Sequence, residues 1–547
     1  MLARELLAVL SLLVASVCSA ALLTALRLPS DMAPLVFAAL FAAAAVAFRR
    51  LPLAAAPAPL RWFEAALIGW AALTGLLRLV PYAAQSLTGR LAAAVHWDDN
   101  WHVQELASLV NSERFPPLLN YQPDTHLHFY YVAWMPAAAL AEMLQRFGLP
   151  AIKLAYGIGA LLLALSAATI LVAFLRHVLP AERRGAALAA LVVAAAVPDG
   201  VALLIRWTGG LAGTPPADWL AHAEWWQRDL GVPNQLSSLT TLLVWVPHHL
   251  IAGAALLLAG VIATEPLSLK PRPSIAAMVA AGLLVAFAAF ASVFALIGGL
   301  VALSPLLVRF AARPQTLVAL AAAALVSAPL AYLYLNADSA GGFRVLLIYT
   351  RWAETFGGAA AGLTGLAFAA LFLTAEIGWL AWLALRPPPS PLKSPLGRCA
   401  IAATLFVAST VVIGFSGANN WAMRGAIVPV VVIATCWAAV RADAAEGALR
   451  HGSRPALAAV PILVSLAAVT HVAEMARHGR DSVAAIDFAG ETEACKARIM
   501  AANAGPPGPV DPTGWDCRAI YSLYGLERPF TKRDLSQPDR ELMGRGP

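Results

Sequence analysis

Residues 151–175, AIKLAYGIGALLLALSAATILVAFL, form an apolar run in which Lys153 carries the only charge. A helix rises about 1.5 Å per residue, so about 20 apolar residues cross a hydrocarbon core about 30 Å thick. In lipid only helices and closed barrels satisfy their backbones, and this run lacks the alternation of a barrel strand. It therefore predicts a membrane-spanning helix.

The rest of the chain repeats this pattern. Of its 547 residues 60% are hydrophobic and 13% charged, and the mean hydropathy is +0.71. Soluble domains are about half apolar and about a quarter charged. The sequence predicts an all-α polytopic membrane protein with about thirteen transmembrane helices. We expect them at 6–26, 34–48, 62–82, 151–175, 185–206, 236–264, 274–292, 293–312, 315–335, 358–385, 399–416, 424–440 and 455–474.

Lysine and arginine indicate the orientation. Arg4 precedes the first run as in a signal peptide, but the run continues through Leu26, which favours an uncleaved helix. With a cytoplasmic N-terminus, the inner connections carry Arg4, Arg49, Arg50, Arg61, Arg176, Arg183, Arg184, Lys270, Arg272, Arg309, Arg313, Arg386, Lys393, Arg398, Arg441, Arg450 and Arg454. The longer outer connections are poorer in basic residues, as the positive-inside rule requires. We expect a multi-pass protein of the inner (plasma) membrane.

The segment 127–147 decides whether this topology holds. It is apolar enough to span, but a span here would invert every later connection. Its aromatic residues favour the membrane interface, so we predict an interfacial or re-entrant helix.

The domain organisation follows from this topology. We expect a transmembrane domain over 1–474, with a catalytic outer loop at about 83–150, and a small periplasmic tail over 475–547. Cys495 and Cys517 in that tail are disulfide candidates because the compartment is oxidising, with two free thiols as the alternative.

The first long outer loop carries most of the polar chemistry. It contains HWDDNWH at 96–102 and NYQPDTHLHFYY at 120–131. Carboxylates beside imidazoles can act as a general base with an orienting partner, or can bind a cation. In a helix, His102 would share a face with Asp98. A solvated loop with aromatic anchors is the alternative.

These residues resemble the membrane glycosyltransferases of the GT-C superfamily, in an uncharacterised bacterial branch. The resemblance rests on Asp98-Asp99-x-x-His102, HFYY at 128–131, WVPHH at 245–249 and NNWAMR at 419–424. It implies a GT-C-like fold and transfer of a sugar from a polyprenyl-phosphate donor at the extracytoplasmic face. By position, Asp98 would be the base and Asp99 the second acid, with His102 beside them.

The resemblance also implies residues that contact the substrate. Arg424 would hold the carrier phosphate, with Arg344 and Arg351 as weaker candidates. Alternatively, Arg424 reaches lipid headgroups. His248 and His249 lie in a predicted span beside a proline that kinks it, and they serve either a pocket or a neighbouring helix. The remaining substrate-binding candidates are His126, His128, Tyr130, Tyr131 and Asn420.

The acceptor is expected to be a lipid or a glycan. The peptide-acceptor WWD motif of oligosaccharyltransferases is missing, and Glu224-Trp225-Trp226 is only superficially similar. A divalent cation could bind Asp98, Asp99 and His102, and the resemblance leaves this open, since some members of the superfamily need a metal and others do not. The sequence has no nucleotide-binding glycine motif, and its net charge of +7 needs no nucleic-acid partner.

Two other classes of function stay open. A transporter or flippase for polyprenyl lipids or glycolipids would show inverted repeats and broken helices, and no repeat is visible. A non-catalytic lipid-binding assembly subunit would not depend on Asp98 or Asp99.

Overall fold

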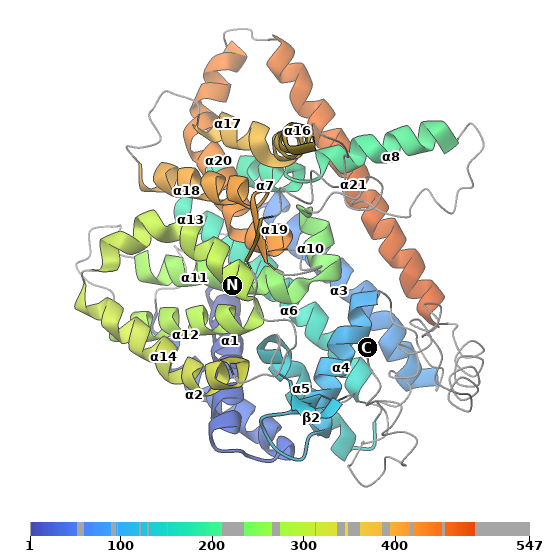
Figure 1. Cartoon of the computed structure of the whole chain (residues 1–547), viewed down its shortest axis with the longest axis vertical. Helices are drawn as coiled ribbons and strands as arrows, with labels where there is room; N and C mark the ends of the chain where they lie inside the picture. Colours follow the sequence, from blue (N-terminus) through green and yellow to red (C-terminus); the bar gives the residue numbers. More distant parts are fainter. Residues whose placement is uncertain are drawn as a thin grey trace.

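The computed structural model is almost entirely helical (Figure 1). It describes residues 2–51, 59–88, 95, 97–119, 122–127, 131–149, 151–210, 235–264, 274–311, 313–335, 345–347, 361–385, 394–415, 421–450 and 454–486. The only strands in this part of the chain form two small antiparallel pairs. β1 (Leu118–Leu119) pairs with β2 (Gln122–His126), and β3 (Val345–Leu347) pairs with β4 (Ile413–Phe415).

Helices account for the predicted apolar segments. The first half of the chain contains α1 (Leu2–Ala25), η1 (Ser30–Met32), α2 (Ala33–Phe48), α3 (Trp62–Thr88), α4 (Trp97–Asn111), η2 (Tyr131–Trp134), α5 (Met135–Arg146), α6 (Ile152–Val178), α7 (Ala181–Val193), α8 (Val197–Gly210), α10 (Leu239–Trp245) and α11 (Pro247–Thr264). The second half contains α12 (Ile275–Ala291), α13 (Val293–Ala311), α14 (Pro314–Leu335), α16 (Ala361–Leu373), the π-helix η5 (Thr374–Gly378), α17 (Trp379–Leu385), α18 (Pro395–Ser409), α19 (Trp421–Gly425), α20 (Ile427–Arg450) and α21 (Arg454–Ile486).

Several of these helices could cross a membrane. Within the described ranges, six are long and apolar enough, or up to eight if the bent pairs α7–α8 and α10–α11 are each one span. The apolar helices of α12, α13, α18 and α20 are shorter, and α21 is not among the candidates. The chain is therefore a multi-pass helical membrane protein, and the count of thirteen spans stays a prediction.

Helices α3 and α6 pack closely along much of their length. A Cβ placed on Gly75 would lie 2.6 Å from the Leu161 Cα, and one on Gly157 would lie 3.0 Å from the Leu79 Cα. Small residues allow such close approach. In lipid the hydrophobic effect does not drive helices together, so the van der Waals contacts of closely packed helices stabilise the pair instead.

Polar clusters tie this helix pair together near both ends. At one end the Arg176 Nε on α6 donates to Glu64 Oε1 on α3 at 3.0 Å. At the other end, Arg78 and Tyr82 on α3 and Tyr156 on α6 converge on the outer-loop helix α4. About 21–27 Å of α3 separates the clusters, close to the thickness of a hydrocarbon core.

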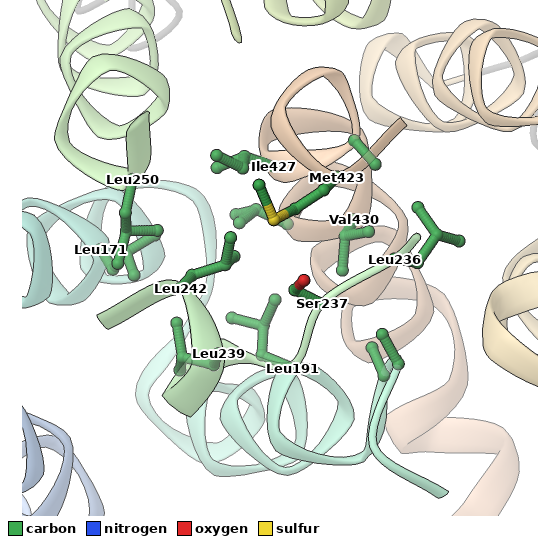
Figure 2. Close-up of a pocket in the computed structure, with 14 residues that line it drawn as sticks. Leu171, Leu191, Leu236, Ser237, Leu239, Leu242, Leu250, Met423, Ile427 and Val430 are labelled. Atoms are coloured by element: carbon green, nitrogen blue, oxygen red, sulfur yellow. The ribbon is translucent and has the colours of Figure 1, made fainter. Parts of the chain in front are cut away.

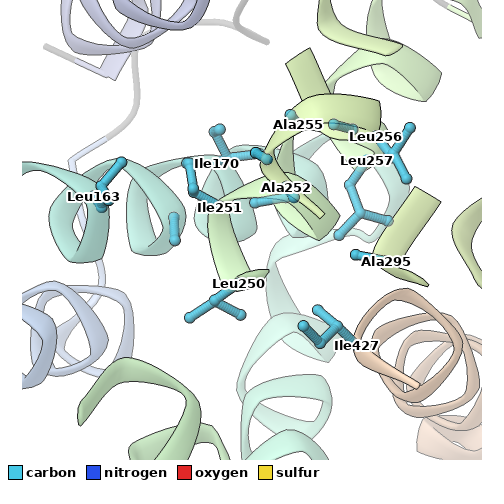
Figure 3. Close-up of a cluster of buried hydrophobic side chains, with 14 of the residues drawn as sticks. Leu163, Ile170, Leu250, Ile251, Ala252, Ala255, Leu256, Leu257, Ala295 and Ile427 are labelled. Carbon is cyan, nitrogen blue, oxygen red and sulfur yellow. The ribbon is translucent and has the colours of Figure 1, made fainter. Parts of the chain in front are cut away.

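The interior is built around α11. Figure 3 shows Leu250, Ile251, Ala255 and their neighbours packed against side chains such as Ile170 of α6 and Ile427 of α20, all buried. This close-packed apolar centre fixes the direction of α11 and thereby the position of its first turn.

The chain turns sharply where α11 begins. Helices α10 and α11 are bent by 119° at Val246, which has φ −135° and ψ 54°. Pro247 follows as the first residue of α11, where its missing N–H costs nothing. The sequence predicted a proline kink inside one span. The observed break is sharper, and it places His248 and His249 in the first turn of a new helix.

The outer-loop elements gather at one end of the molecule. In Figure 1, α4, β2 and α5 lie together at the lower end, and α16 and α17 lie at the upper end. Helix α5 has 12 residues and is about 18 Å long, too short to cross a hydrocarbon core. The predicted interfacial or re-entrant helix agrees with this length.

The predicted domain boundary at 474 falls inside a helix. Helix α21 continues without interruption to Ile486, so the start of the predicted tail is part of α21. Cys495 and Cys517 lie outside the described residues, and their pairing stays a prediction.

Candidate functional site

Among the described side chains of the outer loop, Asp99 is the carboxylate with the most hydrogen-bond and ion-pair partners. It lies in the first turn of α4 and is 0% exposed. Its Oδ1 is 3.0 Å from Nη2 of Arg78 and accepts a hydrogen bond from the Tyr156 hydroxyl at 2.7 Å. Its Oδ2 accepts a hydrogen bond from the Tyr82 hydroxyl at 3.0 Å. Both oxygens are therefore occupied by donors from α3 and α6.

Arg78 connects this carboxylate to the broken helix pair. The guanidinium is 2% exposed and also donates to the carbonyl oxygen of Val244, close to the end of α10. Removing one partner of a buried ion pair leaves the charge of the other partner buried and uncompensated, which is unfavourable. The Arg78–Asp99 pair therefore ties the start of α4 to α3 and to the end of α10.

His102 forms a second polar pair on the same helix. Its Nδ1 is 2.8 Å from Glu105 Oε2, and the two residues are 5% and 4% exposed. A spacing of three residues places both side chains on neighbouring positions of the α4 surface. Glu105 is not among the residues predicted from the sequence, although its spacing of three residues from His102 is the signal that could have identified it.

Three imidazoles meet where α4 faces α11. The ring centroids of His102 and His248 are 4.3 Å apart, and those of His248 and His249 are 3.9 Å apart. The Trp134 indole lies 5.5 Å from the His102 ring and 6.1 Å from the His248 ring, centroid to centroid. We call His102, Glu105, Trp134, His248 and His249 the imidazole cluster.

Arg424 adds a cation near this cluster. It is half-buried in the short helix α19 and interacts electrostatically with both His248 and His249. Trp421 anchors α19: its Nε1 donates to the Ile413 carbonyl at 2.7 Å, and its ring packs against Phe294 and Phe406. Gly425 lies so close to α13 that a Cβ on Gly298 would meet its carbonyl oxygen.

An apolar pocket adjoins these polar residues. It lies between α6, α7, α10, α11 and α20, and its volume is about 30 Å³ (Figure 2). Leu250 on its wall follows His249 in the chain, and Met423 on its wall precedes Arg424. The pocket lining thus includes the chain neighbours of His249 and Arg424, and none of the residues of the imidazole cluster itself.

Two other predicted residues belong to elements other than α4 and α11. His126 is exposed at the end of β2. Tyr131 is 4% exposed at the start of η2, with its hydroxyl against the Thr24 side chain of α1. Burial raises the pKa of Tyr131 to about 12, so the hydroxyl stays neutral and packs as part of the core.

Several predictions cannot be placed. Asp98 lies in the first turn of α4, but its side chain is outside the described part of the structure. The same holds for the whole of His128, Tyr130, Arg344, Arg351 and Asn420.

The predicted metal site is only partly visible. Among the described residues, no group of three or more His, Cys, Asp or Glu side chains is arranged to hold a metal ion. Asp99 already accepts from Arg78, Tyr82 and Tyr156, and His102 Nδ1 is occupied by Glu105. The Glu105 contact engages only one ring nitrogen of His102, and the Asp98 side chain is outside the described residues. The divalent-cation site therefore stays a prediction.

Neither a protein-family model nor a curated protein matches this chain. Its function is therefore inferred from its own residues.

Proposed function

We propose that this chain is an integral membrane glycosyltransferase of the GT-C type. It moves a sugar from a polyprenyl-phosphate donor to a lipid or glycan acceptor at the extracytoplasmic face of the inner membrane. The observation that carries the proposal is the buried approach of His102, His248 and His249, with Arg424 nearby. His102 lies on α4, whose first turn contains Asp98 and Asp99.

In the proposed reaction, Asp98 acts on the acceptor hydroxyl, whereas Arg424 and the imidazoles act on the phosphate of the donor. Asp98 takes the proton of the acceptor hydroxyl while the acceptor oxygen bonds to the anomeric carbon. The bond from that carbon to the phosphate oxygen breaks, and its electrons leave with the polyprenyl phosphate. A single displacement of this kind inverts the anomeric centre.

The leaving phosphate requires donors and positive charge. Arg424 and the imidazoles supply them, and the low-polarity surroundings strengthen each contact. The apolar pocket beside Leu250 and Met423 gives the first part of the carrier chain an apolar wall. A chain that enters it displaces flexible Leu and Met side chains, because the pocket is small.

The structure changes the role expected for Asp99. With both oxygens accepting from Arg78, Tyr82 and Tyr156, it is poorly available as a base. We assign it to holding the first turn of α4, which positions Asp98. No step of the proposed reaction passes through a metal ion.

The test is sugar transfer by the purified full-length protein in proteoliposomes. Labelled sugars on polyprenyl-phosphate carriers serve as donors, with nucleotide sugars as the comparison. Transfer from the lipid-linked donors alone supports the proposal. Absence of transfer across a broad donor set, in protein that remains monodisperse, contradicts it.

One observation favours the rival class of a lipid transporter. The α10–α11 break places two histidines at a bent helix junction, and discontinuous helices are typical of transporters. The same proteoliposomes distinguish the two functions, because a flippase changes the leaflet of the labelled lipid without cleaving it.

A further inference from the structure

A second polar cluster lies at the other end of the α3–α6 pair, and we call its members Glu64, Arg61, Arg176 and Arg184 the Glu64 cluster. Glu64 is 1% exposed in the first turn of α3. Arg176, in the last turn of α6, donates from Nε to Oε1 at 3.0 Å and from Nη2 to Oε2. The backbone N–H of Arg61 also donates to Oε2, at 3.0 Å. One guanidinium and one backbone amide therefore satisfy this buried carboxylate.

Two further guanidiniums belong to the same cluster. Arg184, near the start of α7, interacts electrostatically with Glu64 and also with the like charges of Arg176 and Arg61. Its Nη1 is 3.7 Å from Glu64 Oε1, which is longer than a hydrogen bond. The Arg61 side chain is exposed, and within the described ranges it makes no hydrogen bond or ion pair. The cluster therefore holds more positive charge than Glu64 neutralises.

Contacts within the fold account for part of this charge. The Nε of Arg184 donates to the Leu179 carbonyl at 3.1 Å, and its Nη2 donates to the Arg176 carbonyl at 3.4 Å. Arg184 thus caps the C-terminal end of α6. The exposed Glu182 also acts on Arg184. These contacts leave the Nη1 donors of Arg184 and the whole guanidinium of Arg61 for a ligand. Both side chains stay charged at every physiological pH, so the excess charge does not depend on titration.

The level of the Glu64 cluster in the membrane indicates which anion it meets. The cluster lies about one hydrocarbon thickness from the Asp99 end of the same helix pair. Trp62 directly follows Arg61 and is 81% exposed, and tryptophan favours the membrane–water interface. Arginines at this level reach lipid headgroups. A phospholipid phosphate presents its free oxygens to a guanidinium in a geometry that allows paired hydrogen bonds.

We propose that Arg61 and Arg184 bind the headgroup phosphate of an anionic phospholipid at this interface. A zwitterionic headgroup brings its own cation, whereas an anionic one neutralises the excess charge of the cluster. Glu64 and Arg176 position the site, because their ion pair holds the start of α3 against the end of α6. The bound lipid joins the starts of α3 and α7. This inference goes beyond the proposed function and does not depend on sugar transfer.

The experiment measures lipid binding to the full-length protein in detergent by native mass spectrometry. Phosphatidylglycerol is compared with phosphatidylcholine of the same acyl chains, and we expect the wild type to bind phosphatidylglycerol about ten-fold more tightly. Arg61→Gln/Arg184→Gln should bind the two lipids with nearly equal affinity. Arg49→Gln/Arg50→Gln is the matched control. It removes the same charge from exposed residues after α2, which we expect on the same side of the membrane, and it should keep the preference.

The outcomes decide whether the site exists. Equal binding of the two lipids by the wild type overturns it, and so does a preference that Arg61→Gln/Arg184→Gln retains. A preference that the control also loses reflects general attraction to a basic surface and overturns the specific site. Displacement of phosphatidylglycerol by inorganic phosphate at the same concentration assigns the site to free phosphate and overturns the lipid assignment.

Arg61→Gln alone decides the question if the double variant does not fold. The Arg61 side chain makes no hydrogen bond or ion pair within the described residues, and its backbone N–H still reaches Glu64. A loss of about three-fold in the preference for phosphatidylglycerol supports the site. An unchanged preference overturns it.

Discussion

The guanidinium of Arg78, inside a helix that can span the membrane, lies 3.0 Å from the carboxylate of Asp99 on the outer-loop helix. This contact joins the loop that carries the predicted chemistry to the transmembrane framework. Tyr82 and Tyr156 complete it from α3 and α6. The position of α4 therefore depends on a buried polar network as well as on apolar packing.

Removing one member of the ion pair should be costly. Arg78→Met leaves Asp99 buried with only the two tyrosines as donors, and we expect a loss of about 3–5 kcal/mol of stability. The double variant Arg78→Met/Asp99→Leu should be more stable than Arg78→Met alone, because it leaves no buried charge. Thermal unfolding in detergent measures both, and an unchanged midpoint in Arg78→Met would contradict the assignment.

The two tyrosines should contribute separately. Tyr82→Phe and Tyr156→Phe each remove one hydrogen bond to the charged Asp99, worth about 1.5–3 kcal/mol. Tyr82→Phe also removes the hydrogen bond that the Val95 N–H donates to the Tyr82 hydroxyl. Tyr332→Phe is the control, because Tyr332 is 67% exposed on α14. Unfolding midpoints of the two buried variants that match this control would show that the hydroxyls do not support Asp99.

The position of Arg424 on α19 should depend on Gly298 of α13. A Cβ at this position would meet the carbonyl oxygen of Gly425, so Gly298→Ala must push α19 away from α13. We expect a lower midpoint of thermal unfolding in detergent and weaker binding of farnesyl phosphate, a short isoprenyl phosphate. Gly69→Ala has no atom within 4 Å of the new Cβ and should be neutral or slightly stabilising. Equal behaviour of both variants would contradict the close contact.

Glu142 should make stability depend on pH. Burial raises the pKa of this α5 carboxyl above its ordinary value of 4.5. A raised pKa means that the folded state binds the proton more tightly than the unfolded state does. The stability gained from this protonation is therefore complete below about pH 4.5 and is lost as the pH rises through the pKa of the folded state. Glu142→Gln should therefore gain stability relative to the wild type from pH 4 to pH 8. A constant difference across that range would exclude burial as the cause.

Much of the fold could be predicted because apolar length is a strong signal. Each predicted span contains helix in the structure, since lipid leaves the backbone few alternatives. The sharp break at Val246 was harder to foresee. Pro247 marks a helix start as readily as a kink, and only packing around α11 decides between them.

The candidate site was predicted in part. His102, His248 and His249 were chosen from local motifs, and the structure brings their rings together. The partners of Asp99 were missed because they come from two other helices, and local spacing carries no information about such contacts. Arg78 was the available clue, since an arginine within an apolar run requires a partner.

The central claim is that the adjacent acids differ, with Asp98 acting on the substrate and Asp99 holding the helix. The most direct measurement compares Asp98→Asn and Asp99→Asn for sugar transfer in proteoliposomes and for thermal unfolding. Asp31→Asn is the control, because Asp31 is the exposed residue of η1. The account predicts that Asp98→Asn abolishes transfer at an unchanged unfolding midpoint, whereas Asp99→Asn lowers the midpoint. Full transfer by Asp98→Asn, or loss of transfer in Asp99→Asn at wild-type stability, would contradict it.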